Sequence, residues 1–248
     1  SGVMNKGVFE VSEEGTPQGG PLSPLLSNIM LNELDKELER RGLPFVRYAD
    51  DSMIFCKSKR APRRVKESIT RFIENVLYLK VNKEKTVVSY VRGMKYLGYS
   101  FYVMKGKCQL TVHPKSKDKM KSKLKELTSR SNGWGYAKRK QELKEYIRGW
   151  VGYYHLANMK RLLLETDEWL RRRIRMCVWK SWKKVKTKVA NLIRCGINKY
   201  QAYEWGNTRK GYWRIANSGI LHRAITNEHL CRAGYATLIG SYLEWHPK

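Results

Sequence analysis

The spacing of the apolar residues changes at Pro114, and this change constrains the fold more than any other feature of the sequence. Before Pro114, short apolar runs bounded by turn residues are mixed with two helical patterns, which is typical of helices packed on an antiparallel sheet. After Pro114 the spacing is helical over 115–127, 142–156 and 161–185. We therefore expect an α+β segment, then an all-α segment, then a small mixed and mostly helical region.

The α+β segment contains two amphipathic helical patterns and several short strand patterns. Apolar residues over 22–38 predict a helix that Ser23 or Thr16 could cap and that Gly42 ends. A second helix is expected over 65–76. Short runs of apolar and β-branched residues predict strands. These strands are expected at 7–11, 45–49, 52–56, 86–90, 96–103 and 109–112.

Charge divides the chain at nearly the same place. The chain has 50 Lys and Arg against 22 Asp and Glu, a formal net charge of +28. Residues 1–114 carry 19 basic and 12 acidic side chains, net +7, and residues 115–248 carry 31 and 10, net +21. So large an excess indicates a polyanionic partner. Nucleic acid is the leading candidate, and an anionic membrane surface is the weaker one.

The cysteines and the lengths of the apolar runs indicate the subcellular location of the protein. Five scattered cysteines without a Cys-x-x-Cys pair indicate reduced thiols. No uncharged apolar run approaches the length of a membrane-spanning helix. We therefore expect a cytoplasmic protein that associates with nucleic acid and not with a membrane.

The sequence Tyr48-Ala49-Asp50-Asp51 lies between two apolar runs at hairpin spacing. Adjacent carboxylates repel each other unless a cation lies between them. Mg²⁺ takes oxygen ligands and is often held by one or two carboxylates together with substrate phosphates. Two such ions can stabilise the entering and leaving oxygens of a phosphoryl transfer. An ordinary polar turn remains the alternative, since Asp is common in turns.

The second half combines basic runs with tryptophans. Arg171–Arg175 and the run 180–188 put many cations on helices, which suits phosphate binding. All eight Trp follow residue 133. Trp150, Trp169 and Trp179 lie at helical spacing, which favours a place in the core, although stacking on exposed bases remains open.

Three further motifs accompany the paired aspartates in a fixed order. A Gly- and Pro-rich loop covers 16–24, Leu79–Thr86 reads LKVNKEKT, and Met94–Tyr99 reads MKYLGY. With the paired aspartates they resemble the back half of the palm of a group II intron reverse transcriptase, or maturase. The run Asn207–Gly211 is similar to one in bacterial members of the group IIC type. The resemblance covers essentially the whole chain.

The resemblance implies a domain order and roles for residues. It implies a partial palm over 1–114, a helical thumb or X (maturase) domain over 115–187 and a basic DNA-binding region over 188–248. Asp50 would bind catalytic Mg²⁺ in a two-metal site, with Asp51 as a further ligand or support. The residues near the template and nucleotide would be Pro17, Gln18, Gly19, Tyr48 and Ala49. The primer grip would be Tyr96, Leu97 and Gly98.

Lys85 is the expected proton donor to the leaving pyrophosphate, because a lysine there supplies both charge and a proton. A solvated surface lysine is the alternative. For Tyr96 and Leu97 the alternative is plain strand packing.

One departure from the family pattern concerns a third carboxylate, which the palm takes from an upstream strand. Glu13, Glu14, Asp35 and Glu37 lack that strand-end position. We therefore expect the fingers, the first palm segment and the third carboxylate to lie outside this chain, which would not polymerise DNA alone.

The resemblance implies an RNA-directed DNA polymerase that binds an RNA template, a DNA or RNA primer, dNTPs and a group II intron RNA, and that supports splicing and retrohoming. A non-catalytic, RNA-binding maturase or splicing cofactor is the alternative.

Overall fold

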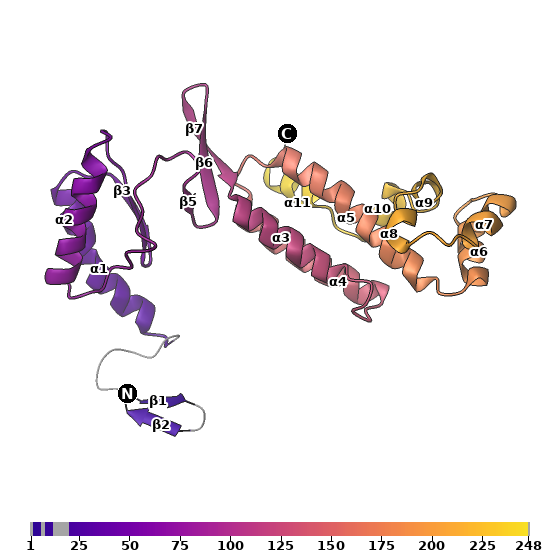
Figure 1. Ribbon diagram of the computed structural model, residues 1–248, viewed down its shortest axis with the longest axis horizontal. Coiled ribbons are helices and arrows are strands. Elements are labelled where there is room, and N and C mark those ends of the chain that lie inside the picture. Colours follow the sequence, from indigo (N-terminus) through magenta and orange to yellow (C-terminus); the bar gives the residue numbers. More distant parts are fainter. Residues whose placement is uncertain (1, 6–7, 12–19, 248) are drawn as a thin grey trace. The chain divides into compact units, whose positions relative to one another are not determined.

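The structure, a computed structural model, describes residues 2–5, 8–11 and 20–247 (Figure 1). The chain forms two compact units, Ser1–Tyr90 and Val91–Lys248, and each unit is described by itself. None of the described helices has both the length and the apolar character needed to cross a membrane.

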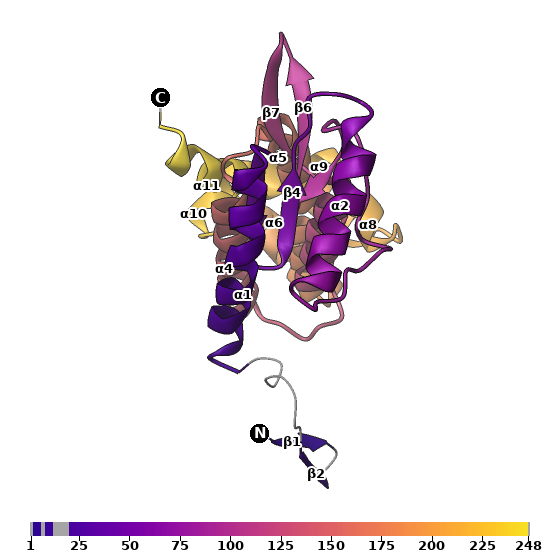
Figure 2. The same ribbon diagram turned by 90° about the vertical axis from the view of Figure 1, so that its left-hand side faces the viewer.

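The first unit contains two short antiparallel ribbons and two helices. The ribbon of β1 (Gly2–Asn5) and β2 (Val8–Val11) comes first, and that of β3 (Phe45–Tyr48) and β4 (Asp51–Ile54) lies between the two helices in sequence. The helices are α1 (Ser23–Arg40) and α2 (Ala61–Asn75). Figure 1 and Figure 2 together show α1 and α2 on one face of the second ribbon. Leu34, Leu38, Ile69 and Leu77 form the buried core, against which Phe45 of β3 and Ile54 of β4 pack. This core joins α1, α2 and the second ribbon.

The two halves of helix α1 differ in how far their apolar side chains are exposed. Leu34 and Leu38 in its second half are buried, whereas Leu22, Leu25 and Ile29 in its first half are 56–61% exposed. Residue Leu22 occupies the N-cap position without a side-chain hydrogen bond, so the expected cap by Ser23 is wrong, and Thr16 lies outside the described residues. The helix ends before Gly42, as predicted.

The second unit begins with a three-stranded antiparallel sheet and continues with helices. The strands are β5 (Lys95–Tyr96), β6 (Tyr99–Met104) and β7 (Lys107–Val112), in that order across the sheet. The longer helices are α3 (Pro114–Leu127), α4 (Tyr136–Tyr154), α5 (Lys160–Ser181) and α6 (Val185–Arg194). The shorter ones are α7 (Lys199–Gly206), α8 (Tyr212–Ile215), α9 (Gly219–Ala224), α10 (Asn227–Arg232) and α11 (Leu238–Trp245).

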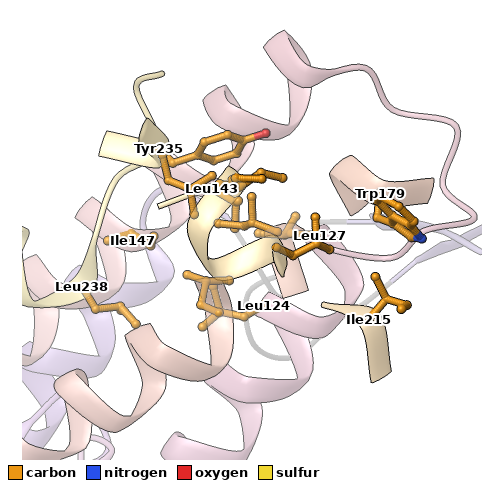
Figure 3. Packing of buried hydrophobic residues seen from close by; sticks show 14 of the residues in the cluster. Leu124, Leu127, Leu143, Ile147, Trp179, Ile215, Tyr235 and Leu238 are labelled. Atoms are coloured by element: carbon orange, nitrogen blue, oxygen red, sulfur yellow. The ribbon is translucent and has the colours of Figure 1, made fainter. Parts of the chain in front are cut away.

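One hydrophobic core holds the second unit together. Helices α3, α4 and α5 run side by side, and α11 packs on α4 and α5 (Figure 1). Apolar side chains from all of these helices meet between them (Figure 3). The labelled members are Leu124, Leu127, Leu143, Ile147, Trp179, Ile215, Tyr235 and Leu238. The coarse fold prediction, an α+β segment followed by helices, agrees with this arrangement.

Three of the expected elements are wrong in detail. Residues 86–90 form no strand, and Val87 and Tyr90 are largely exposed. The strand expected over 96–103 is interrupted by a two-residue turn. The helix expected over 161–185 ends at Ser181, because Trp182 leaves helical geometry and packs edge-on against Trp179 at 5.7 Å between ring centroids.

Two charged side chains of α5 are buried and form hydrogen bonds with backbone groups at the ends of other helices. The Asp167 carboxylate accepts hydrogen bonds from the backbone N–H groups of Leu238 and Ile239, each at 2.9 Å, at the start of α11. Burial raises the pKa of Asp167, and these two hydrogen bonds oppose the rise. The Arg175 guanidinium donates to the Ile225 carbonyl oxygen at 2.8 Å. Arg175 therefore belongs to the core, not to the cationic surface that its basic run suggested.

Candidate active site

The paired aspartates lie at the end of the β3–β4 ribbon, so the predicted hairpin is present, but its turn begins one residue earlier than expected and Asp51 belongs to β4. Tyr48 pairs with Asp51 across the ribbon, so Ala49 and Asp50 form a two-residue turn. Ala49 has a φ of +51°, a left-handed conformation that disfavours side chains with a Cβ. Asp50 and Asp51 are exposed, and the Tyr48 side chain beside them is 66% exposed. The turn therefore presents two carboxylates and an aromatic ring to solvent.

An arginine within the ribbon binds it to α1. The Arg47 guanidinium donates to both carboxylate oxygens of Asp35, at 2.8 and 2.5 Å, and to the Asn28 side-chain oxygen at 2.9 Å. A further bond reaches the Ala49 carbonyl oxygen at 2.9 Å. The Arg47 and Asp35 side chains are only 13% and 20% exposed. Asp35 therefore supports the position of the turn, a role that the sequence did not suggest.

We expect Asp35→Asn to weaken the attachment of the ribbon to α1 by about 1–3 kcal/mol, because it leaves a largely buried guanidinium without its carboxylate partner. Hydrogen exchange at the amides of β4 measures this local loss. The matched control is Glu33→Gln on the same helix, whose pair with Lys36 is mostly exposed. That change should cost under about 0.5 kcal/mol. Equal exchange rates in the two variants would contradict the supporting role of Asp35.

The donor chemistry of the turn suits a hard cation. Carboxylate oxygens are the ligands that Mg²⁺ prefers, and Asp50 and Asp51 provide them on adjacent residues. Among the described residues, no group of three acidic, histidine or cysteine side chains could hold a metal ion. Asp50 and Asp51 could therefore supply part of the ligand set of such an ion.

Lys85 lies in a turn that is anchored to α2. The backbone N–H of Lys85 donates to the Asn82 side-chain oxygen at 3.1 Å, and Lys66 of α2 donates to the Thr86 carbonyl oxygen at 2.5 Å. The Lys85 side chain is exposed, which leaves both the proton-donor role and the surface-lysine alternative open. Pro17, Gln18 and Gly19 lie outside the described residues.

The expected primer-grip residues form a tight turn in the second unit. Tyr96 pairs with Tyr99, and Leu97 and Gly98 between them have φ values of +49° and +80°. This pattern is typical of the two-residue hairpin turns that match the twist of a sheet. The alternative of plain strand packing for Tyr96 and Leu97 therefore fits Tyr96 but not Leu97, which makes the turn together with Gly98.

Side chains of α3 and α4 hold this turn in place. The Tyr153 hydroxyl donates to the Leu97 carbonyl oxygen at 2.9 Å, and the Ser116 hydroxyl donates to the Gly98 carbonyl oxygen at 3.0 Å. The backbone N–H of His113 donates to the same Gly98 oxygen at 3.0 Å. Neither Ser116 nor Tyr153 was expected at this turn. The helical spacing of the aromatic residues on α4 is a signal for Tyr153, and the sequence holds no comparable signal for Ser116.

Cations and aromatic rings also meet on the surface near α5 and α8. The Arg172 guanidinium lies 3.8 Å from the ring centroid of Trp213, which is 38% exposed. Trp179 and Trp182 are buried, so the expectation of a core position is confirmed for Trp179. Trp150 and Trp169, expected in the core on the same spacing, are only partly buried against it. Compared with Trp179 and Trp182, Trp213 is the tryptophan that a nucleic acid could reach.

Comparison with known proteins identifies two family regions. The family model for reverse transcriptase (RNA-dependent DNA polymerase) matches residues 3–101, which include the aspartate turn and the Leu97–Gly98 turn. The model for the group II intron maturase-specific domain matches residues 117–196, from α3 to the end of α6. The two matches follow each other along the chain in the order that the motifs predicted.

Three curated proteins are similar to parts of the chain. The chain is 31% identical over 134 residues to Protein YkfC of Escherichia coli (strain K12), covering 40% of this chain and 35% of that protein. It is 27% identical over 168 residues to Group II intron-encoded protein LtrA of Lactococcus lactis subsp. cremoris, covering 42% and 28%. It is 31% identical over 83 residues to Retron Ec86 reverse transcriptase of Escherichia coli, covering 32% and 26%.

These alignments span about a third or less of the length of each relative. Both family regions nevertheless occur in one chain, in the same order as the motifs. The chain therefore belongs to the group II intron reverse transcriptase and maturase family.

Proposed function

We propose that this chain carries part of the active centre of an RNA-directed DNA polymerase of group II intron type. The observation that supports this most directly is the presentation of two adjacent, exposed carboxylates at a hairpin turn of a protein with net charge +28. A purely cationic RNA-binding surface gains nothing from carboxylates exposed beside phosphates. Their presence favours a bound divalent cation.

The residues of the turn would bind and orient the reactants. Asp50 and Asp51 would hold Mg²⁺, which when bound supplies charge stabilisation for phosphoryl transfer from a dNTP. The Tyr48 ring and Ala49 backbone would lie against the primer end or nucleotide, with Pro17, Gln18 and Gly19 completing the contact. Phosphoryl transfer depends mainly on such positioning and on charge stabilisation.

The second unit would bind the template and primer, and the group II intron RNA during splicing. Its sequence carries most of the net positive charge, and its surface combines cations with exposed aromatic rings such as Arg172 and Trp213. Cations contact phosphates and rings stack on bases, so this surface suits RNA and DNA.

The test measures binding and primer extension with the chain alone, an RNA template, a DNA primer, dNTPs and Mg²⁺. We expect binding whose affinity falls about a thousand-fold between about 50 and 200 mM salt if about six phosphates are contacted. We expect no extended product without a further polypeptide that supplies the missing carboxylate. Robust cDNA synthesis by the chain alone would contradict the incomplete site, and binding that is insensitive to salt would contradict the proposed partners.

A second candidate function is that of a splicing cofactor that binds intron RNA without catalysis. The match of residues 117–196 to the maturase-specific domain favours it, because that region contains none of the residues of the aspartate turn. An intron-splicing assay with Asp50 and Asp51 both replaced separates the two functions. Splicing that survives the loss of both carboxylates assigns it to the second unit.

A further inference from the structure

A cavity of about 300 Å³ lies in the second unit between the Leu97–Gly98 turn and the helices α3 and α4. This volume is at the lower end of the range for sites that hold small molecules. Lysines line one part of the cavity, and aromatic rings of α4 line another. The combination of lysines and aromatic rings, and not the volume alone, indicates what the cavity can bind.

The cationic part consists of Lys95 on β5 and of Lys115 and Lys119, which lie one helical turn apart on α3. All three side chains belong to exposed residues, and the described lining residues include no Asp or Glu. Burial, and then the positive charges of Lys95, Lys115 and Lys117, lower the pKa of the neighbouring His113. These lysines therefore create a positive field that suits a phosphate group.

The aromatic part is a stripe along α4. Tyr146, Trp150 and Tyr154 are spaced by four residues, and Tyr153 beside them is 53% exposed. The rings of Trp150 and Tyr154 lie 4.7 Å apart between centroids. A planar base can stack on such rings whatever its identity. A phosphate and a planar aromatic group together define a nucleotide.

The wall that the Leu97–Gly98 turn provides is held in place by side chains. The Leu97–Gly98 turn is held by the hydroxyl groups of Tyr153 and Ser116, so a ligand does not have to order it. A preorganised wall lowers the entropic cost of binding. The cavity can accept a ligand without a change in the backbone around it.

We propose that this cavity binds one unpaired nucleotide of a nucleic-acid strand, with a phosphate on Lys115 and Lys119 and the base against the aromatic stripe of α4. This inference rests on the proposed function, in that the chain must bind RNA or DNA. A cavity of about 300 Å³ fits one base more closely than a base pair. We therefore expect single strands to depend on the cavity more than duplexes do.

The test compares two double variants of α3 with equal changes in charge. Lys115→Gln with Lys119→Gln removes the phosphate contacts, whereas Lys121→Gln with Lys125→Gln alters exposed lysines that do not line the cavity. Fluorescence anisotropy measures the affinity for a labelled single-stranded RNA of about 24 nucleotides and for a blunt duplex of about 12 base pairs, which carries nearly the same number of phosphates. We expect about a ten-fold loss for single strands in the cavity variant and about a two-fold loss in the control. The duplex should respond equally to both.

Photocrosslinking locates the base directly. A single-stranded RNA with one 4-thiouridine should attach to the peptide that carries Tyr146, Trp150 and Tyr153, as mapped by mass spectrometry. Equal losses in the two double variants, or crosslinks only to other peptides, would overturn the cavity assignment while leaving the proposed function intact. Failure of the unaltered chain to bind any RNA or DNA would overturn both.

Discussion

Replacing Asp50 and Asp51 together with Asn lowers cDNA synthesis by at least about a thousand-fold, equivalent to about 4 kcal/mol of transition-state stabilisation. This is the expected result in any preparation in which the chain supports polymerisation with a partner segment. The side chains keep their size but lose the anionic oxygens that a hard cation requires. RNA affinity should stay within about two-fold, since the changed residues carry no positive charge that phosphates need. Single-turnover primer extension and filter binding measure the two effects.

The control for this prediction removes the same amount of negative charge elsewhere in the first unit. Glu67 and Glu84 are exposed, and replacing both with Gln should leave synthesis nearly unchanged. Equal losses of synthesis and RNA binding in the Asp50 and Asp51 variant would argue against separate catalytic and binding roles. Comparable losses in the aspartate and glutamate variants would argue that net charge, and not a metal site, is responsible.

The second large effect is expected for Gly98→Ala, which would cause both backbone strain and a steric clash. The Gly98 φ of +80° costs a residue with a Cβ about 1–2 kcal/mol. The new methyl group would also overlap the Tyr154 hydroxyl. The Tyr154 ring cannot move aside readily, because it packs against Tyr99, Trp150 and Tyr153 at centroid distances of 5.2, 4.7 and 4.7 Å.

We therefore expect Gly98→Ala to destabilise the second unit by about 2–5 kcal/mol, the sum of backbone strain and overpacking. For a unit of this size, this lowers the melting temperature by about 5–15 °C. Thermal unfolding followed by circular dichroism measures the change. Primer binding should fall as well if the turn is a primer grip.

The chain contains a matched control in the next hairpin. Gly106 has a φ of +74° and follows Lys105 with a φ of +51°, but no atom lies within 4 Å of the position of an added Cβ. Gly106→Ala should therefore show the backbone strain alone. Adding Tyr154→Phe to Gly98→Ala should recover part of the difference, because it removes the overlapping oxygen. Equal destabilisation at the two glycines would show that the packing on Tyr154 contributes nothing.

The local patterns of the sequence predicted those parts of the fold that depend on neighbouring residues. The α1 and α2 helices and the aspartate hairpin follow from apolar spacing and from a two-residue gap between strands. The pattern over 96–103 failed because an apolar residue at a turn, Leu97, has the same appearance as one in a strand. The run 86–90 failed because β-branched residues form a strand only when a partner strand pairs with them.

The sequence motif of the candidate site could be predicted, but the contacts that hold the site in place could not. The motif order identified Asp50 and Asp51, but nothing in the sequence links Asp35 to Arg47. The same limit applies to charge, since the run around Arg175 gives no sign that this side chain turns inward. Such contacts arise from the packing of separate elements, and the metal site, the Lys85 role and the Pro17–Gly19 contact stay predictions.

The hydrogen bonds that hold the Leu97–Gly98 turn affect how the turn can move. Because hydroxyl groups of both α3 and α4 donate to its carbonyl oxygens, we expect the turn to move together with these helices. A force that a bound nucleic acid exerts on the turn would then act on α3 and α4 as well, and a displacement of these helices would shift the turn.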